Sequence, residues 1–72
     1  MPQIRLSSEV TGTVCKVEVR PGDTVATGQD LVILESMKME IPVAAPRAGT
    51  VREVLVKDGE PVSEGQDVVV LE

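Results

Sequence analysis

The feature that most constrains the fold of this 72-residue chain is an internal repeat. A shift of 37 residues places Thr11–Glu35 over Ala48–Glu72 without a gap, and 13 of the 25 aligned positions are identical. The first copy reads TGTVCKVEVRPGDTVATGQDLVILE and the second reads AGTVREVLVKDGEPVSEGQDVVVLE. The likeness extends weakly upstream, over residues 4–6 and 41–43. Two copies of one unit in so short a chain indicate a single domain, residues 1–72, with a pseudo-twofold axis.

Each unit predicts strands joined by tight turns. The chain has 14 Val and no aromatic residue, and β-branched side chains favour a pleated strand over a helix. Pro42, Pro46 and the frequent Gly further disfavour a long helix. Apolar residues do not alternate strictly along the first strand of each unit, so we expect a bulge near Cys15-Lys16 and near Arg52-Glu53. The predicted strands are Gly12–Val19, a very short one at Val25, and Leu31–Glu35, with Gly49–Val56, Val62 and Val68–Glu72 in the second unit.

Composition excludes several classes of function. The net charge is −5, and the chain has neither a basic stripe nor aromatic residues on which bases could stack, so nucleic acid is not an expected partner. No apolar run approaches membrane-spanning length and no basic-plus-apolar signal segment begins the chain, so we expect no membrane partner. The expected location is the cytoplasm, or an organelle matrix if the domain is excised from a larger organellar protein.

Nucleophilic and metal chemistry also lack their usual residues. The chain has no His, which removes the commonest metal ligand and general base, and we predict no metal site and no catalytic residue. Cys15 is the single cysteine, so an internal disulfide is impossible. Its repeat counterpart is Arg52, and we therefore expect Cys15 to be at least half exposed and to be an incidental thiol.

The stretch Glu35-Ser36-Met37-Lys38-Met39-Glu40 lies where the two units join. The first unit ends at Glu35 and the upstream strand of the second begins near Met39, so the chain must reverse between them, with Lys38 at the tip. Local turn chemistry does not indicate this reversal, because the stretch has no Asn-Gly or Asp-Gly. The turn follows from the repeat alone. The position that matches Lys38 in the upstream copy is Met1.

Two alternatives remain open from the residues themselves. Met37 and Met39 could both point into the core, in which case Lys38 would point outward from a strand and not occupy a turn. Glu35 could be a recognition residue or simply a solvent-facing strand end, since its repeat counterpart Glu72 has no lysine to serve.

The sequence ESMKME, followed by an apolar strand and Ala45-Pro46, resembles the attachment site of biotinyl domains, the biotin carboxyl carrier modules of biotin-dependent carboxylases. The resemblance covers almost the whole chain, because the Gly-Thr-Val and Gly-Gln-Asp elements of both units also look like the halves of that family. Lipoyl domains share the fold but usually carry Asp-Lys-Ala at the tip. Ser36 departs from the commoner Ala, and we expect that change to be tolerated.

The resemblance implies an all-β fold: a flattened β-barrel or sandwich of two four-stranded antiparallel sheets, with the attachment lysine on a hairpin tip. Val19 to Val25 has the same length as Val56 to Val62, so the thumb that some members insert in the first half is absent. The size is similar to that of small biotin/lipoyl attachment proteins, and it also suits a domain excised from a large carboxylase.

The resemblance further implies the chemistry of the site. Lys38 is expected to carry covalent biotin, with Met37, Met39 and Glu35 as recognition residues. The implied partners are a biotin protein ligase and the biotin carboxylase and carboxyltransferase subunits or domains of a carboxylase. Lipoate is the alternative cofactor, and an unmodified adaptor whose hairpin binds a partner ranks below both. The chain itself is expected to be a carrier and not an enzyme.

Overall fold

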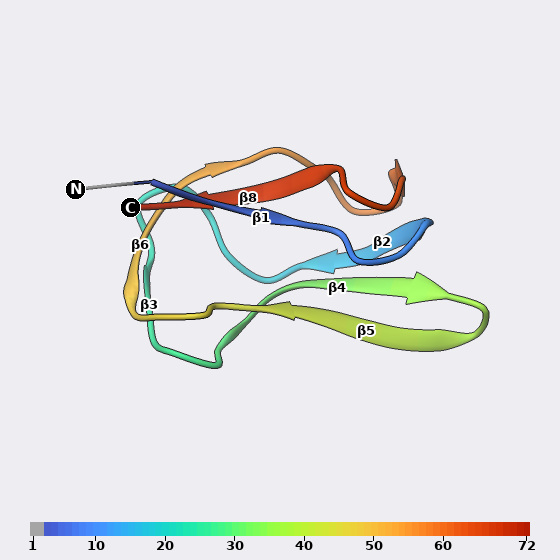
Figure 1. Cartoon of the computed structure of the whole chain (residues 1–72), viewed down its shortest axis with the longest axis horizontal. Helices are drawn as coiled ribbons and strands as arrows, with labels where there is room; N and C mark the ends of the chain where they lie inside the picture. Colours follow the sequence, from blue (N-terminus) through green and yellow to red (C-terminus); the bar gives the residue numbers. More distant parts are fainter. Residues whose placement is uncertain (1–2) are drawn as a thin grey trace.

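The computed structural model describes residues 3–72, and every regular element in that range is a β-strand (Figure 1). No helix there is long and apolar enough to cross a membrane. The strands form two four-stranded antiparallel sheets, ordered β1-β8-β6-β3 and β5-β4-β2-β7. The bounds are β1 Ile4–Ser7, β2 Gly12–Val17, β3 Thr24–Val25, β4 Asp30–Ser36, β5 Met39–Ala44, β6 Gly49–Val54, β7 Pro61–Val62 and β8 Asp67–Leu71.

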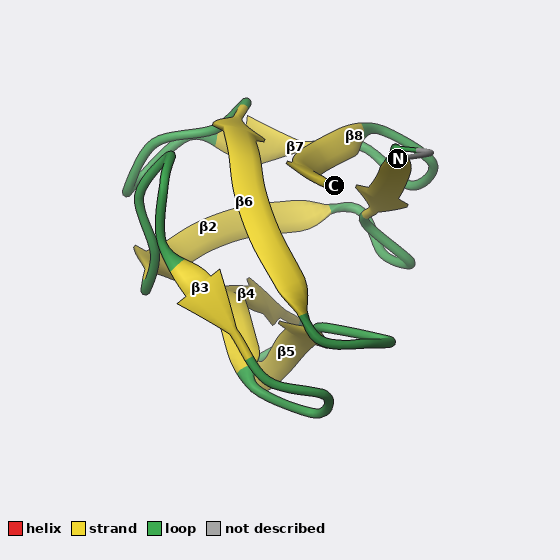
Figure 2. Cartoon of the chain, turned by 90° about the vertical axis from the view of Figure 1, so that its left-hand side faces the viewer, coloured by secondary structure: helices red, strands yellow, loops and turns green. Residues whose placement is uncertain are grey.

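The two sheets are copies of each other under the sequence repeat. The 37-residue shift carries β1 to β5, β2 to β6, β3 to β7 and β4 to β8, which turns the strand order of one sheet into that of the other. Figure 2 shows this arrangement from the end of the molecule that carries both termini. The pseudo-twofold symmetry predicted from the repeat is confirmed. The upstream counterpart of Lys38, Met1, lies outside the described residues.

The short strands tie the two units together. β3 of the first unit pairs with β6 of the second, and β7 of the second pairs with β2 of the first. The turns before these short strands also bind to the opposite unit: Gly22 N donates to Val51 O at 2.7 Å, and Gly59 N donates to Val14 O at 2.8 Å. Both glycines adopt a positive φ, 95° and 85°, as their turns require. Neither unit can therefore complete its own sheet.

The core between the sheets is aliphatic. Three leucines that are 0% exposed lie at its centre, and valines surround them. Burial of each such side chain contributes about 1.5–3 kcal/mol to the free energy of unfolding. Because the chain has no aromatic residue, its stability depends on the sum of many aliphatic contributions of this size. The leucines are Leu31, Leu34 and Leu71.

The predicted irregularities are present, with one correction. The register shifts between Val14 and Lys16 and between Val51 and Glu53, where the bulges were expected. The first strand, however, ends at Val17 and not at Val19. The Val17 N–H donates to the Asp58 carboxylate at 2.7 Å while Val17 still pairs with Val32, and Val19, beyond the end of the strand, remains buried.

The same correction applies to the second unit, where β6 ends at Val54 and not at Val56. Here too the valine beyond the strand stays in the core, with Val56 only 4% exposed. Cys15 lies in the bulge of β2 and is exposed, as expected from its alignment with Arg52 in the sequence repeat.

Candidate functional site

Lys38 occupies the apex of the hairpin between β4 and β5. Met37 and Lys38 are the two residues of the connecting turn, and their φ angles are 51° and 67°. Positive φ at both central positions is the signature of a type I′ turn, whose twist matches that of the flanking strands. Asn and Gly usually fill these positions, because other residues lose about 1–2 kcal/mol each in the left-handed region.

The strands impose this turn on residues that do not favour it. β4 and β5 pair in continuous register from Ile33–Pro42 to Ser36–Met39, which leaves only two residues to close the hairpin. The register itself is anchored by the Leu34–Ile41 pair, in which Leu34 is fully buried. A slip of one residue would turn Leu34 out of the core, so burial fixes the turn length.

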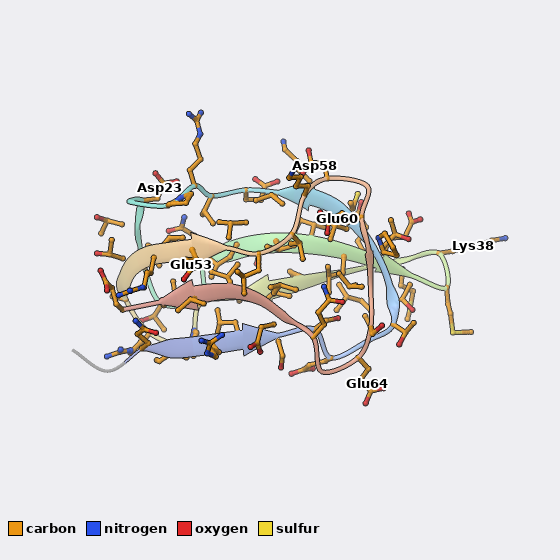
Figure 3. All side chains as sticks on the ribbon, turned by 90° about the horizontal axis from the view of Figure 1, so that it is seen from above. Asp23, Lys38, Glu53, Asp58, Glu60 and Glu64 are labelled. Atoms are coloured by element: carbon orange, nitrogen blue, oxygen red, sulfur yellow. The ribbon has the colours of Figure 1, made fainter. Side chains whose placement is uncertain are left out.

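The hairpin presents its apex to solvent. Lys38 is exposed, and the flanking Met37 and Met39 are 90% and 59% exposed. Figure 3 shows the Lys38 side chain extending away from the barrel, and the tip lies at the end opposite both termini (Figure 1). The alternative in which both methionines point into the core is therefore wrong, and the predicted tip is confirmed.

A close backbone contact supports the base of the hairpin. Gly12 of β2 lies against the end of β4, where a Cβ on Gly12 would stand 2.2 Å from the Glu35 carbonyl oxygen. The Ser36 hydroxyl donates to the Thr11 carbonyl at 3.0 Å on the same side. Sequence reasoning had singled out neither contact, although the identity of Gly12 and Gly49 in the repeat was a signal that could have suggested the first. These contacts fix the direction in which the hairpin leaves the barrel.

The two acids beside the tip face each other. Glu35 and Glu40 are directly paired across the hairpin, and both are exposed. The repeat counterpart of Glu35, Glu72, forms an ion pair with Arg52 at 3.3 Å. In the first unit Cys15 stands where that arginine would be, and the ion pairs found within residues 3–72 do not include Glu35. The tip thus keeps two unneutralised carboxylates next to one lysine.

The group that the hairpin presents at its apex is the amine of Lys38. Lys38 has no ion-pair partner among residues 3–72. No group of three or more His, Cys, Asp or Glu side chains in that range is arranged to hold a metal ion. An exposed ammonium is a poor nucleophile at neutral pH, so the site can accept an acyl group only from an activated donor.

Comparison with known proteins places this geometry in context. The family model described as "Biotin-requiring enzyme" matches residues 1–71. The biotin/lipoyl attachment protein of Bacillus subtilis is 49% identical over 43 residues, which cover 60% of this chain and 59% of that protein. A biotinylated protein TB7.3 homolog of Mycolicibacterium smegmatis is 53% identical over 38 residues, which cover 53% of this chain and 54% of that one. The matched stretch thus spans just over half the length of these relatives.

Among solved structures, Kluyveromyces lactis urea carboxylase contains a region that superposes on all of this chain. The TM-score is 0.93 and the sequence identity is 36%, while the match covers 6% of the carboxylase. The fold inferred from the resemblance, two four-stranded antiparallel sheets with the lysine on a hairpin tip, is confirmed by the structure and by this superposition.

Proposed function

The chain belongs to the biotin/lipoyl attachment family, and from that premise we propose that Lys38 is its biotinylation site. A biotin protein ligase joins biotin to the lysine, and the resulting arm carries carboxybiotin from a biotin carboxylase active site to a carboxyltransferase active site. The domain is a biotin/lipoyl carrier, related to biotinylated proteins and to the carrier domains of carboxylases. The observation that carries the proposal is the position of Lys38 at the apex of a two-residue turn.

The attachment step needs presentation and no catalysis from the carrier. The ligase supplies the acyl group as biotinyl-adenylate: the lysine Nζ forms an amide with the biotin carboxyl carbon, the bond from that carbon to the phosphate oxygen breaks and AMP leaves, and the ammonium group loses two protons while the amide nitrogen keeps one. For that step the carrier must offer an amine clear of its own fold and at a reproducible place. The Leu34–Ile41 register and the Gly12 contact provide both.

Attachment changes the charge of the tip. Seven basic residues become six against twelve acids, so the net charge moves from −5 to −6. The modified arm is neutral and long, and tethering replaces free diffusion with an effective concentration on the order of mM. The neighbouring Glu35 and Glu40 then leave the tip with an uncompensated negative charge, which suits docking on basic partner surfaces.

Mass spectrometry after co-expression with a biotin protein ligase tests the proposal. We expect one biotin adduct per chain, located on Lys38 by peptide mapping, and no adduct on the Lys38→Arg variant. Lys16→Arg is the matched control, because it exchanges another exposed lysine and should leave the yield unchanged. An adduct that persists in Lys38→Arg, or an unmodified wild-type chain, would refute the assignment.

A lipoyl carrier is the second candidate, and the name of the Bacillus relative favours keeping it. Parallel co-expression with a lipoate ligase separates the two, because exposed Met37 and Met39 predict that biotin is attached in the higher yield. The unmodified adaptor would carry neither group. For the location we propose the cytoplasm, or an organelle matrix if the domain is excised from a larger organellar protein. Fractionation of cells that express the natural gene checks this.

A further inference from the structure

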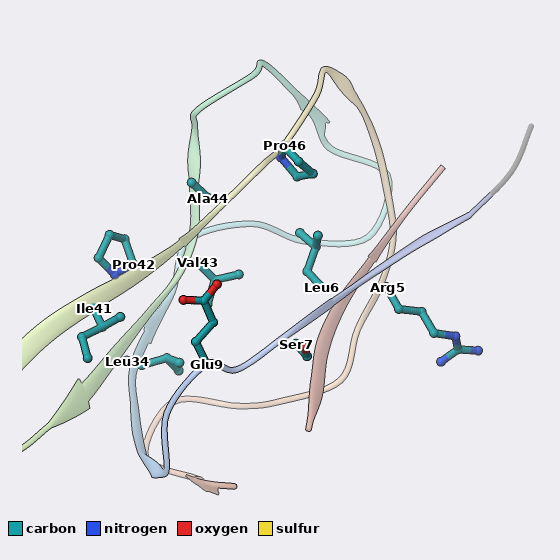
Figure 4. A pocket seen from close by; sticks show the side chains of 10 residues that line it. All are labelled: Arg5, Leu6, Ser7, Glu9, Leu34, Ile41, Pro42, Val43, Ala44 and Pro46. Carbon is teal, nitrogen blue, oxygen red and sulfur yellow. The ribbon is translucent and has the colours of Figure 1, made fainter. Parts of the chain in front are cut away.

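A groove opens between β1 and β5, which are edge strands of different sheets (Figure 4). Its volume is about 360 Å³, within the range of small-molecule sites. Half-buried aliphatic side chains of both strands form its walls, and the buried Leu34 lies at its floor. Its lining includes Leu6, Glu9, Leu34, Ile41, Val43 and Pro46.

The repeat relates the two ends of this groove to each other, but the sequence makes them different. Leu6 and Val43 are counterparts, and so are Glu9 and Pro46. One end therefore carries a carboxylate where the other carries a proline ring. Glu9 lines the same groove as Ile41 and Val43, and Figure 4 shows its carboxylate on their side of the groove, away from Pro46. Glu9 has no ion-pair partner within residues 3–72.

The end with the carboxylate is the end nearer Lys38. At about 3.4 Å per residue along β5, Ile41 lies roughly 10 Å from Lys38 and Val43 roughly 17 Å from it. Eleven bonds separate the Lys38 Cα from the bicyclic ring of an attached biotin, a reach of roughly 14 Å for an extended arm. The ring can thus reach Ile41 and the near side of Val43, and it cannot reach the far end beside Pro46.

We infer that the groove between β1 and β5 is a resting site for the biotinyl arm of Lys38, with Glu9 accepting the ureido N–H groups. The inference rests on the proposed biotinylation. The thioether side of the ring packs on Ile41, Val43 and Leu6, and the polar ureido edge faces the one carboxylate at that end. Hydrogen bonds from N–H groups to a carboxylate are the stronger kind, and they give the site a preference for biotin over a ring without N–H donors.

The amide spectra of the apo and biotinylated domains test the inference. We expect attachment to shift the ¹H–¹⁵N resonances of residues 6–9 and 41–43 in addition to those of residues 36–40. Shifts confined to residues 36–40 would overturn the inference. Mass spectrometry of the same sample distinguishes the two failures: a missing adduct contradicts the proposed function, whereas an adduct without groove shifts contradicts only the resting site.

Two variants and the lipoylated domain provide further tests of the inference. Glu9→Gln should reduce the groove shifts at least twofold, because it removes the charge of the acceptor with little change of shape. Glu40→Gln is the matched control: Glu40 is also exposed and lies closer to Lys38, but it does not line the groove, and it should leave the shifts unchanged. Equal effects of the two variants would refute the role of Glu9.

The lipoylated domain, whose dithiolane ring has no N–H, should show groove shifts that are smaller and insensitive to Glu9→Gln. Lipoyl shifts equal to those of biotin would contradict the assignment of the ureido contact. Groove shifts that appear in the apo domain when its concentration is raised would place a second copy of the chain in the groove, and would also overturn the inference.

Discussion

Replacing Gly12 with alanine should destabilise the domain, although a glycine with ordinary backbone angles usually tolerates that change. Gly12 is not among the glycines with positive φ, so alanine brings no backbone strain there. Without a clash, Gly→Ala stabilises a protein by about 0.4–1 kcal/mol, because it restricts the unfolded chain. The contact with β4 is therefore expected to reverse the sign of the effect.

The size of the effect follows from the contact. An added Cβ would lie 2.2 Å from the Glu35 carbonyl oxygen, 3.1 Å from the Glu35 carbonyl carbon and 3.2 Å from the Ser36 Cβ. Relief requires the backbone of β4 to move by roughly 1 Å, and overpacking of this kind costs about 1–3 kcal/mol. A net loss of about 2 kcal/mol is a large part of the roughly 4–11 kcal/mol expected for a 72-residue domain. It corresponds to a fall in Tm of about 8–16 °C.

The repeat supplies a matched control. Gly49 occupies the same position in the second unit, where a Cβ would lie 2.7 Å from the Glu72 carbonyl oxygen and 3.8 Å from its carbon. Gly49→Ala should therefore cost less than Gly12→Ala, by about 1 kcal/mol. It should also leave biotin attachment unchanged, because Glu72 is at the far end of the barrel from Lys38 (Figure 1). For Gly12→Ala we expect about a tenfold loss in kcat/KM of the ligase, since a shift of 1 Å in a presented group is costly.

Far-UV circular dichroism or calorimetry measures these changes, because the chain has no aromatic residue to report by fluorescence. Gly12→Ala as stable as the wild type, or Gly49→Ala the more damaging of the two, would refute the reasoning from close approach. Normal ligase kinetics in a destabilised Gly12→Ala would show that the contact supports the fold and does not position the hairpin.

Three further predictions follow from the same structure. Met37→Asn should raise the stability by about 0.5–1 kcal/mol, because Asn tolerates the left-handed region that Met37 occupies, while it lowers the rate of biotin attachment; thermal melting and ligase kinetics measure the two effects, and an unchanged Tm would contradict the strain. Leu34→Ala and Leu71→Ala should each lower the free energy of unfolding by about 2–5 kcal/mol and agree within about 1 kcal/mol, because the two leucines are fully buried symmetry counterparts. Urea titrations that give very different midpoints would contradict the expectation that the two halves of the core are equivalent. Asp58→Ala should cost about 1 kcal/mol through loss of its hydrogen bond with the Val17 N–H, and Asp58→Asn should recover most of that loss in the same titration.

Much of the fold could be predicted because the sequence contains two copies of the same structural unit. A pattern that is weak evidence in one copy, such as the uneven apolar spacing across Cys15-Lys16, becomes stronger evidence when it recurs across Arg52-Glu53, and both bulges were found where they were expected. The exposure of Cys15 followed from its counterpart in the same way. The strand ends at Val17 and Val54 were missed, because Val19 and Val56 stay in the core outside any regular strand, and an apolar pattern cannot separate the two cases.

The position of Lys38 was predictable for a different reason. A reversal had to lie between the two units, and the sequence placed it at Lys38 even though Met37-Lys38 is an unfavourable turn by local preference. The geometry of that turn was not predictable, because it is set by the β4–β5 register, which depends on the burial of Leu34 against the opposite sheet. The same holds for the contact beneath the hairpin: the sequence shows a glycine at position 12, but only the folded chain brings the Glu35 carbonyl against it.

The sequence by itself determined that the domain is two like β units with one lysine between them, because a repeat and its junction can be read along the chain. Only the tertiary structure decided which strands pair. The repeat is equally compatible with one sheet formed within each unit and with sheets that combine strands of both units, and the structure has the second arrangement. It also decided that two edge strands distant in sequence, β1 and β5, border a groove with Glu9 at the end nearer Lys38. Such neighbours are brought together by burial of the common core, and burial depends on the whole chain at once.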